Sequence, residues 1–312
     1  MIEVSKLSKY YGEFLAVDAL NFQVDQGEVL GFLGPNGAGK TTSMRMLAGF
    51  VTPTAGDARI YGHSICNDSL AARKIMGYLP EGAPLYGEMT PLKFLRFIAD
   101  ARKMLKHEQT AAIGSVVDTL QLGSVLQQPI DTLSKGYRRR VGLAQAILHD
   151  PKVLILDEPT DGLDPNQKHE VRKLISTMSA DRIILVSSHI LEEVAAVCSR
   201  AIIIAQGRIL ADSTPQALVK KSEWHNAVTL QFWKNSLSDE EIEARTAIIA
   251  GIANVKRAES NTIEQSITAF PKDGAAIIHD VNQLVAMMKW APEQCRVEIG
   301  KLDDVFRAIT TQ

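Results

Sequence analysis

A glycine-rich segment, Gly34-Pro35-Asn36-Gly37-Ala38-Gly39-Lys40-Thr41, constrains the fold of this chain more than any other feature. It fits the pattern G-x-x-x-x-G-K-[ST]. A short apolar run, Val29-Leu30-Gly31-Phe32-Leu33, precedes it, and residues from about Lys40 to Ala48 have the pattern of a helix. A strand buried on both faces, followed by a glycine loop and a helix, predicts an α/β fold with a parallel sheet.

The same segment has the chemistry of a phosphate-binding loop. Glycines let backbone N–H groups turn inward around phosphate oxygens, and the following helix directs its positive N-terminus at the anion. Lys40 can reach the β- and γ-phosphates of a nucleotide, and the Thr41 hydroxyl can bind Mg²⁺. We therefore predict that ATP and Mg²⁺ bind here. The expected contacts are Gly34, Pro35, Asn36, Gly37, Ala38, Gly39, Lys40, Thr41 and Thr42.

A second apolar run, Val153-Leu154-Ile155-Leu156, ends in the acids Asp157 and Glu158. The carboxyl ends of parallel strands are where open α/β sheets bind their ligands. Asp157 is expected to hold Mg²⁺, and Glu158 to accept a proton from an attacking water. Such a pair can also cap a helix or lie in a solvated turn, but Pro159 disfavours the helix cap.

The composition is that of a globular protein whose net charge is too small to create a strong overall electrostatic field. Of 312 residues, 46% are hydrophobic and 22% charged, and the formal net charge is -2. The three cysteines, Cys66, Cys198 and Cys295, lack the spacing of a metal site or a disulfide framework. No apolar run approaches the roughly 18–20 residues that span a bilayer, and no apolar signal region opens the chain. We therefore expect a chain that stays in the cytoplasm.

The pattern divides the chain into two expected domains, 1–221 and 222–312. The first has strands at its N-terminus, a mostly helical part at about 90–150, and strands alternating with helices from residue 151. The second is expected to be a small α+β accessory domain, with the split βαβ order. Its expected strands are 227–233, 253–258, 262–270 and 294–299, and its helices 238–250, 273–288 and a final short one.

Four segments within residues 1–220 resemble motifs of the ATP-binding cassette (ABC) ATPases. Leu133-Ser134-Lys135-Gly136-Tyr137 resembles the signature loop, and Leu156-Asp157-Glu158-Pro159-Thr160 with Gly162-Leu163-Asp164 resembles the Walker B strand and D-loop. Val186-Ser187-Ser188-His189 resembles the switch-histidine strand, and Tyr10-Tyr11-Gly12 the segment that stacks on adenine. The resemblance implies a P-loop NTPase fold with an N-terminal antiparallel part and a helical subdomain.

The resemblance also implies a mechanism in which two nucleotide-binding domains face each other head to tail. ATP on Lys40 and Thr41 of one domain would be capped by Ser134 and Gly136 of the other. The remaining implied roles are adenine stacking by Tyr11, contact of His189 with the γ-phosphate, and linkage of the two sites by Asp164. Tyr10 is the alternative to Tyr11, but Tyr11 directly precedes Gly12 as in the family.

The sequence departs from the family pattern at two places. Lys135 and Tyr137 replace the usual glycine and glutamine of the signature, while Ser134 and Gly136 remain. Glu81 replaces the glutamine that usually ends its segment. A carboxylate can also bind Mg²⁺ and accept hydrogen bonds, so Glu81 is expected to contact the nucleotide and the metal.

The segment from Tyr78 to Tyr86 and the terminal Lys301-Leu302-Asp303-Asp304-Val305-Phe306-Arg307 resemble the branch that serves type-2 exporters, including gliding-motility and drug- or polysaccharide-export ATPases. That resemblance implies an ATPase that powers export as a homodimer or heterodimer. It would bind separate transmembrane permease subunits at the cytoplasmic face of the membrane.

Three alternatives can be weighed on sequence features. An importer ATPase often has an all-β C-terminal module, whereas residues 222–312 alternate strand and helix. A non-transport ABC ATPase has a long coiled coil inside the cassette or two cassettes in one chain, and this chain has one cassette and no such heptad run. Arg138-Arg139-Arg140 could form a nucleic-acid patch, but surface charge at a helix start is the simpler interpretation. No nucleic-acid partner is expected.

Overall fold

The computed structural model describes residues 1–310 and divides the chain into two compact units. Unit 1 is Met1–Ser213, and unit 2 begins at Thr214. The boundary therefore lies before the one expected between residues 221 and 222, because α8 (Pro215–Val219) packs against α11 (Leu302–Thr310) and so belongs with unit 2. Within residues 1–310, no helix is both long enough and apolar enough to cross a membrane.

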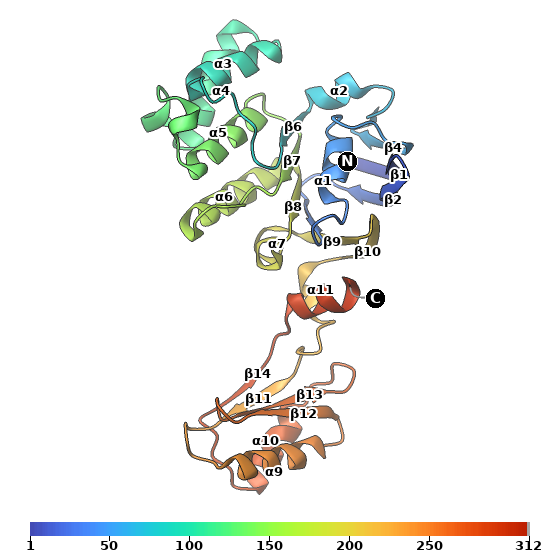
Figure 1. The fold of residues 1–312 in the computed structure, drawn as a ribbon, viewed down its shortest axis with the longest axis vertical. Coiled ribbons are helices and arrows are strands. Elements are labelled where there is room, and N and C mark those ends of the chain that lie inside the picture. Colours follow the sequence, from blue (N-terminus) through green and yellow to red (C-terminus); the bar gives the residue numbers. More distant parts are fainter. Residues whose placement is uncertain (311–312) are drawn as a thin grey trace. The chain divides into compact units, whose positions relative to one another are not determined.

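Unit 1 contains two sheets (Figure 1). The first is antiparallel in the order β2-β1-β4-β5, and its strands are β1 (Ile2–Tyr11), β2 (Phe14–Val24), β4 (Ala55–Ile60) and β5 (His63–Ser64). The second has the order β10-β9-β3-β8-β7-β6, with strands β3 (Val29–Leu33), β6 (Met76–Leu79), β7 (Val153–Asp157), β8 (Ile183–Ser188), β9 (Arg200–Ala205) and β10 (Arg208–Ser213). Its strand pairs are parallel except for β9 with β10, so the predicted parallel α/β core is confirmed.

Continuous apolar runs form the central strands of this second sheet because both of its faces are covered. Every residue of β3, β7 and β8 is buried. Side chains from both sheets and from α1 (Lys40–Leu47) form one core, which includes Phe32, Met44 and Ile155. The rings of Phe22 and Phe32 meet edge to face with centroids 5.2 Å apart. Burial of this kind contributes about 25 cal/mol per Å² of apolar surface.

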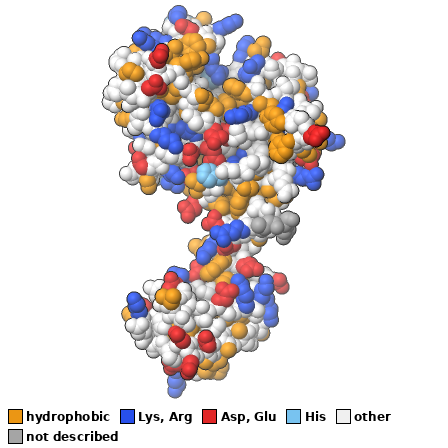
Figure 2. Space-filling model, in the orientation of Figure 1, with side chains coloured by type: hydrophobic (Ala, Val, Ile, Leu, Met, Phe, Trp, Pro, Cys, Tyr) orange, Lys and Arg blue, Asp and Glu red, His pale blue; other side chains and the backbone are white. Residues whose placement is uncertain are grey.

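Three helices of unit 1, α3 (Pro91–Ala101), α5 (Lys135–Ile147) and α6 (Pro165–Met178), begin at a side-chain cap. Thr90 accepts a hydrogen bond from Lys93 N, Ser134 from Tyr137 N and Asp164 from Gln167 N, each at a helix N-terminus. Besides α1 and these three, the helices are α2 (Ser69–Lys74), α4 (Lys106–Thr119) and α7 (Leu191–Val197), with short 3₁₀ turns at Gly123–Val125, Ile130–Thr132 and Ser179–Asp181. Helices α3, α4 and α5 lie together beside the parallel sheet and form the expected helical subdomain (Figure 1). Acidic and basic side chains are interspersed over the visible face of unit 1 (Figure 2).

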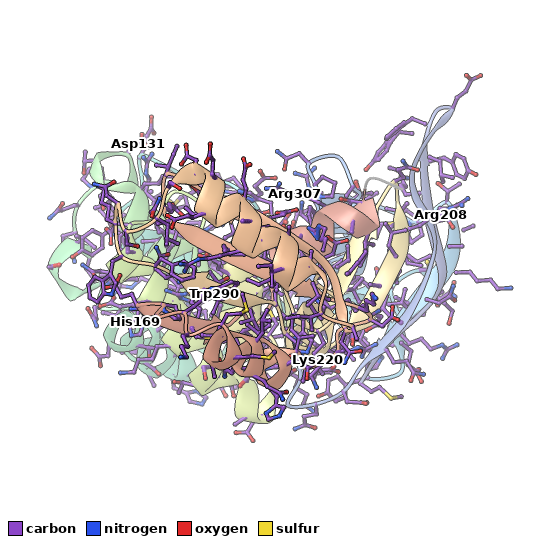
Figure 3. All side chains as sticks on the ribbon, turned by 90° about the horizontal axis from the view of Figure 1, so that it is seen from below. Asp131, His169, Arg208, Lys220, Trp290 and Arg307 are labelled. Carbon is purple, nitrogen blue, oxygen red and sulfur yellow. The ribbon has the colours of Figure 1, made fainter. Side chains whose placement is uncertain are left out.

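Unit 2 has a four-stranded antiparallel sheet in the order β12-β13-β11-β14, with α9 and α10 on one of its faces (Figures 1 and 3). Its elements are β11 (Val228–Gln231), α9 (Asp239–Ala250), β12 (Val255–Asn261), β13 (Ser266–Pro271), α10 (Ile278–Met287) and β14 (Gln294–Val297). Strand β13 lies between β11 and β12, which is the arrangement of a split βαβ unit. Buried apolar residues between helices and sheet, such as Leu230, Ile242 and Val281, form a separate core.

Candidate functional site

The glycine loop joins the carboxyl end of β3 to α1 and leaves the helix N-terminus without a side-chain cap. Gly39 has φ +103°, and a Cβ at this position would lie 2.6 Å from Ala16 O. Glycine is therefore required here on both conformational and steric grounds. The uncapped amides and the helix dipole make this end of α1 a site for an anion.

The Lys40 ammonium lies over the loop. Its Nζ donates to Gly34 O at 2.7 Å and to Pro35 O at 3.2 Å. Burial lowers the pKa of Lys40, while the charges of Glu158, Asp157 and Glu81 oppose that shift. A buried cation beside the uncapped N-terminus of α1 favours a highly charged ligand such as a polyphosphate.

Asp157 ends β7 directly opposite Ser187 of β8. The Ser187 hydroxyl donates to Asp157 Oδ1 at 2.5 Å, and the Thr41 hydroxyl lies 3.3 Å from the same oxygen. Asp157 Oδ2 is buried and has no hydrogen-bond partner among residues 1–310. A buried carboxylate oxygen without a partner is costly, and beside a threonine hydroxyl it fits a hard cation with oxygen ligands. The described residues contain no cluster of three or more His, Cys, Asp or Glu that could bind a metal.

Glu158 follows Asp157 with φ +50°, a rare conformation for a residue with a side chain. Its backbone N–H donates to Ser187 Oγ at 2.9 Å, and its Oε2 lies 3.0 Å from His189 Nδ1. Burial raises the pKa of Glu158, and His189 partly offsets that rise. The structure thus brings together the two residues that the sequence predicted as catalytic, at the carboxyl edge of the sheet.

A cavity of about 350 Å³ lies against Lys40, Thr41 and Glu158, whereas Asp157 and His189 do not line it. It is lined by Tyr11, Phe14, Ala16, Glu81, Glu158 and the loop residues Asn36, Gly37, Ala38, Gly39, Lys40, Thr41 and Thr42. Tyr11 lines it, with Lys9 Nζ 5.3 Å from the Tyr11 ring centroid, whereas Tyr10 is not part of the lining. Phe14, a second and largely exposed aromatic ring, was missed from the sequence. Its signal was present, since the turn between β1 and β2 separates Tyr11 from Phe14 by only two residues.

The signature residues lie apart from this cavity. Ser134 is exposed at the start of α5, and Gly136 is buried against the Gln167 side chain, which a Cβ on Gly136 would approach to 2.6 Å. Asp164 caps α6 through Gln167 N at 3.0 Å, so its carboxylate is already used within its own chain. Gln167 thus contacts both Gly136, through its side chain, and Asp164, through its backbone N–H. None of the three residues Ser134, Gly136 and Asp164 lines the phosphate-loop cavity.

Lys135 lies across the backbone of the segment after Glu158. Its Nζ is 3.4 Å from Asp161 Oδ2, and a Cβ on Gly162 would lie 1.7 Å from the same ammonium. Gly162 also has φ +67°. The side chain that replaces the usual signature glycine thus connects the start of α5 to the turn that follows β7.

The interpretation of Arg138, Arg139 and Arg140 as surface charge was wrong for Arg139. That side chain is buried and donates to Asp157 O and Pro159 O, each at 3.0 Å. The helical pattern could not reveal this, because the acceptors are backbone carbonyls of a distant strand end. Arg139 therefore joins α5 directly to the segment that carries Asp157 and Glu158.

Glu193, on α7, is a further residue that sequence reasoning missed. Its carboxylate accepts a short hydrogen bond from the Thr160 hydroxyl, and its Oε1 lies 2.8 Å from Lys168 Nζ. Ser188 Oγ lies 3.4 Å from Glu193 Oε2. The side chain is only 11% exposed, so one buried carboxylate holds the segments next to Glu158 and His189 and the helix α6 together.

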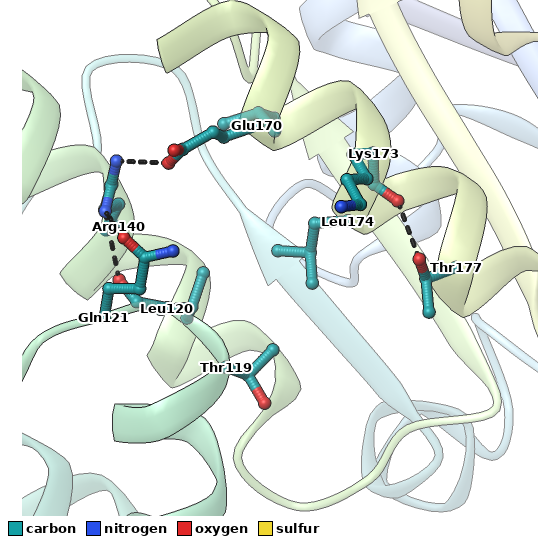
Figure 4. A pocket seen from close by; sticks show the side chains of 9 residues that line it. Thr119, Leu120, Gln121, Arg140, Glu170, Lys173, Leu174 and Thr177 are labelled. Carbon is teal, nitrogen blue, oxygen red and sulfur yellow. Dashed lines mark hydrogen bonds and ion pairs between the residues drawn. The ribbon is translucent and has the colours of Figure 1, made fainter. Parts of the chain in front are cut away.

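A second cavity, of about 340 Å³, lies between the end of α4, α5 and α6 (Figure 4). Arg140 spans it, with Nη2 2.6 Å from Glu170 Oε2 and Nη1 3.4 Å from Leu120 O. It is lined by Thr119, Leu120, Gln121, Arg140, Glu170, Val171, Lys173, Leu174 and Thr177. It shares no lining residue with the phosphate-loop cavity, and its walls are mainly apolar.

Comparison with known proteins gives consistent matches. A family model described as ABC transporter matches residues 17–161. The chain is 38% identical over 219 residues to the Nod factor export ATP-binding protein I of Paraburkholderia xenovorans (strain LB400), covering 70% of this chain and 72% of that protein. It is 35% identical over 223 residues to the Probable multidrug ABC transporter ATP-binding protein YbhF of Escherichia coli (strain K12), covering 71% of this chain. This chain spans only 38% of the length of that second relative.

The fold is also found among solved structures. A structure described as the ATP binding subunit of an ABC transporter aligns with a TM-score of 0.65 and 30% sequence identity. The alignment covers 71% of this chain and 92% of that one.

Proposed function

This chain belongs to the family of ABC transporter ATP-binding proteins, and on that premise we propose that it hydrolyses ATP to power export through separate membrane subunits. The observation that carries the proposal is the position of Glu158. It is a buried carboxylate that lines the same cavity as Lys40 and Thr41 and contacts His189. A base beside a phosphate loop is what hydrolysis of a phosphoanhydride requires.

The residues around the cavity supply binding and orientation. The loop amides and Lys40 hold the phosphates, and Tyr11 or Phe14 offers an aromatic face to the adenine ring. Thr41 and Asp157 would hold Mg²⁺, which when bound neutralises charge on the phosphates. His189 would contact the γ-phosphate while its Nδ1 stays next to Glu158.

Glu158 acts on the attacking water. As the water oxygen forms its bond to the γ-phosphorus, Glu158 accepts a proton from it, and the bond from phosphorus to the β,γ-bridging oxygen breaks. The products are ADP and phosphate. A pKa raised by burial makes Glu158 a better proton acceptor than an ordinary carboxylate.

We propose further that two cassettes act together. Ser134 is exposed at the N-terminus of α5, away from the cavity of its own chain, so it can cap only the ATP of a second cassette. Light scattering tests this with the Glu158→Gln variant, in which ATP should persist. We expect a dimer with Mg-ATP and a monomer without nucleotide. A monomer under both conditions contradicts dimerisation by nucleotide alone.

The assignment to export rests on the relatives, whose names refer to Nod factor export and to multidrug transport. It is also supported by unit 2, which is α+β rather than the all-β module expected of an importer ATPase. The subunit would then act at the cytoplasmic face of a membrane. Purification of the tagged chain from detergent-solubilised membranes should recover a transmembrane permease, and recovery of a substrate-binding importer complex would contradict the proposal.

Activity itself is tested by Lys40→Ala. We expect loss of ATP turnover together with weaker nucleotide binding, because Lys40 is the buried cation over the loop. The matched control is Lys74→Ala, an exposed lysine at the end of α2. Equal turnover in both variants would contradict ATP hydrolysis at this loop.

A further inference from the structure

Unit 2 contains a cavity of about 530 Å³ that the proposed ATPase cycle does not use. Its lining is Lys220, Lys221, Ser222, Glu223, His225, Lys256, Arg257, Phe270, Pro271, Lys272, Asp273 and Gly274. All of these residues belong to unit 2, and none lines the phosphate-loop cavity. They come from the turn after α8, from β12, and from the end of β13 with the loop that follows it; Lys220 is labelled in Figure 3.

The lining is basic, in contrast to the chain as a whole. It has five lysine and arginine side chains against two carboxylates, a formal charge of +3, while the whole chain has -2. Cations concentrated in a concave surface raise the local concentration of anions, because low-dielectric walls focus the field. A volume within the usual range of about 300–1,000 Å³ for ligand pockets accommodates a small molecule or a head group.

The acids of the cavity leave much of this charge unbalanced. Glu223 is shared by two cations, Lys256 at 3.5 Å and Arg257 at 3.2 Å. Arg257 also lies 3.1 Å from Glu259, which is outside the lining. The side chains of Lys220 and Lys221 have no hydrogen bond or ion pair within residues 1–310.

Part of the basic lining is held in place before any ligand arrives. The Arg257 guanidinium lies 3.8 Å from the centroid of the Phe270 ring, and Trp224 packs edge to face on that ring at 5.0 Å. Lys272 Nζ donates to Ala253 O at 2.8 Å. Arg257 Nη2 and Nε already face Glu223 and Glu259, so a phosphate would share this guanidinium with the two acids. The fixed position of the stacked guanidinium reduces the entropy cost of binding.

We propose that this cavity binds a phosphate-bearing anion. Arginine suits phosphate through paired N–H donors, and lysines contribute as point charges around it. The phosphate can belong to a soluble phosphorylated compound or to a phospholipid head group, since both present the same chemistry. Unit 2 would thereby act as an anion-binding module.

The first experiment uses the full chain with inorganic pyrophosphate in metal-free buffer, followed by intrinsic tryptophan fluorescence. All three tryptophans, Trp224, Trp233 and Trp290, lie in unit 2, and Trp224 contacts the Phe270 ring of the cavity. The signal therefore reports on unit 2 rather than on the phosphate loop. The second experiment is sedimentation with vesicles of phosphatidylcholine alone or mixed with phosphatidylglycerol. Binding in the first identifies a soluble phosphate, and binding only in the second identifies a lipid head group.

Two double variants distinguish binding in this cavity from non-specific attraction of anions to the positive charge of unit 2. The double variant Lys256→Gln/Arg257→Gln should weaken whichever binding is observed by about tenfold or more. The control Lys234→Gln/Lys289→Gln removes the same charge from unit 2 outside the cavity and should change binding less than about twofold. If the first variant does not fold, Lys220→Gln/Lys221→Gln replaces it, because those side chains have no partners to lose. Absence of binding in both experiments, or equal losses in cavity and control variants, overturns the proposal.

Discussion

The Oε2 atom of Glu158 lies 3.0 Å from Nδ1 of His189, so the carboxylate that follows β7 and the imidazole that follows β8 contact each other directly. Hydrogen bonds of Ser187 hold the two strand ends that carry this contact. Ser187 donates to Asp157 Oδ1 and accepts from Glu158 N, which fixes the register of the two strand ends. Glu158 is thus placed by hydrogen bonds from a rigid sheet, and its rare positive φ keeps its carboxylate at the cavity.

The burial of Glu158 predicts a cost in stability that depends on pH. Burial raises its pKa in the folded state above the ordinary value of 4.5. Between pH 4.5 and its higher folded-state pKa, Glu158 therefore binds a proton more readily in the folded state than in the unfolded state. The free energy of unfolding consequently falls as pH rises through this range. Glu158→Gln removes this cost. We expect its Tm to exceed that of the wild type at pH 7 and the difference to shrink as pH falls toward 4.5. A difference that is constant with pH would contradict a raised pKa.

We expect the substitution of Glu193 to destabilise the fold, and the substitution of the adjacent Glu192 to leave it nearly unchanged. Glu193→Gln leaves Lys168 without its buried counter-ion and weakens the contacts to Thr160 and Ser188. We expect the free energy of unfolding in urea to fall by about 1–3 kcal/mol. Glu192→Gln, on the same helix but exposed, should stay within about 0.5 kcal/mol of the wild type. Similar values for both variants would show that the Glu193 contacts do not stabilise the fold.

His149 predicts sensitivity to mild acid. Burial, aided by the Arg102 charge, lowers its pKa from 6.5 to about 4, and Arg102 Nη1 lies 2.7 Å from its Nε2. Between pH 6.5 and 4, the unfolded state therefore binds a proton at His149 more readily than the folded state does. The free energy of unfolding is thus undiminished by His149 above pH 6.5 and falls as the pH drops from 6.5 toward 4. His149→Gln should flatten that part of a Tm-against-pH curve. An unchanged slope would mean that other groups govern the acid response.

Local patterns in the sequence predicted the elements that carry the site. The loop around Lys40 and the acids Asp157 and Glu158 each lie at one strand end, where a buried apolar run stops and polar residues begin. Their meeting at one edge follows from the parallel sheet, which the alternation of strand and helix also predicted. The caps at Thr90 and Ser134 are equally local, because each joins residues only three apart in the sequence.

What the sequence could not predict depends on contacts between distant segments. Ser187 meets Asp157 only because β7 and β8 pair in one particular register. Arg139 is buried with its guanidinium donating to the backbone carbonyls of Asp157 and Pro159. Every residue has such a carbonyl, so the sequence does not show which ones will accept a hydrogen bond from a distant side chain. The boundary before Thr214 depends on α8 packing against α11, whose sequence lies at the other end of unit 2.

The division into units predicts that unit 2 is not needed for nucleotide binding. The phosphate loop and the other residues proposed to contact ATP lie in Met1–Ser213. A chain ending at Ser213 should fold and bind Mg-ATP within about threefold of the full-length affinity, or under ~0.7 kcal/mol. Circular dichroism establishes folding, and equilibrium dialysis with labelled ATP measures the affinity. A folded truncated chain that does not bind ATP would contradict this division of roles.

Glu81 and Glu158 both line the phosphate-loop cavity, and their variants should have different effects. Glu158 is buried and held by Ser187 and His189, whereas Glu81 follows β6 in a segment without regular structure. A base needs the more rigid position, because small displacements of the water are costly in rate. Glu158→Gln should lower single-turnover hydrolysis about 10²–10⁴-fold at saturating Mg-ATP while ATP still binds. Glu81→Gln should change the rate by less than roughly tenfold, or under ~1.4 kcal/mol of barrier. Abolished hydrolysis in Glu81→Gln with near-normal hydrolysis in Glu158→Gln would reverse the two roles.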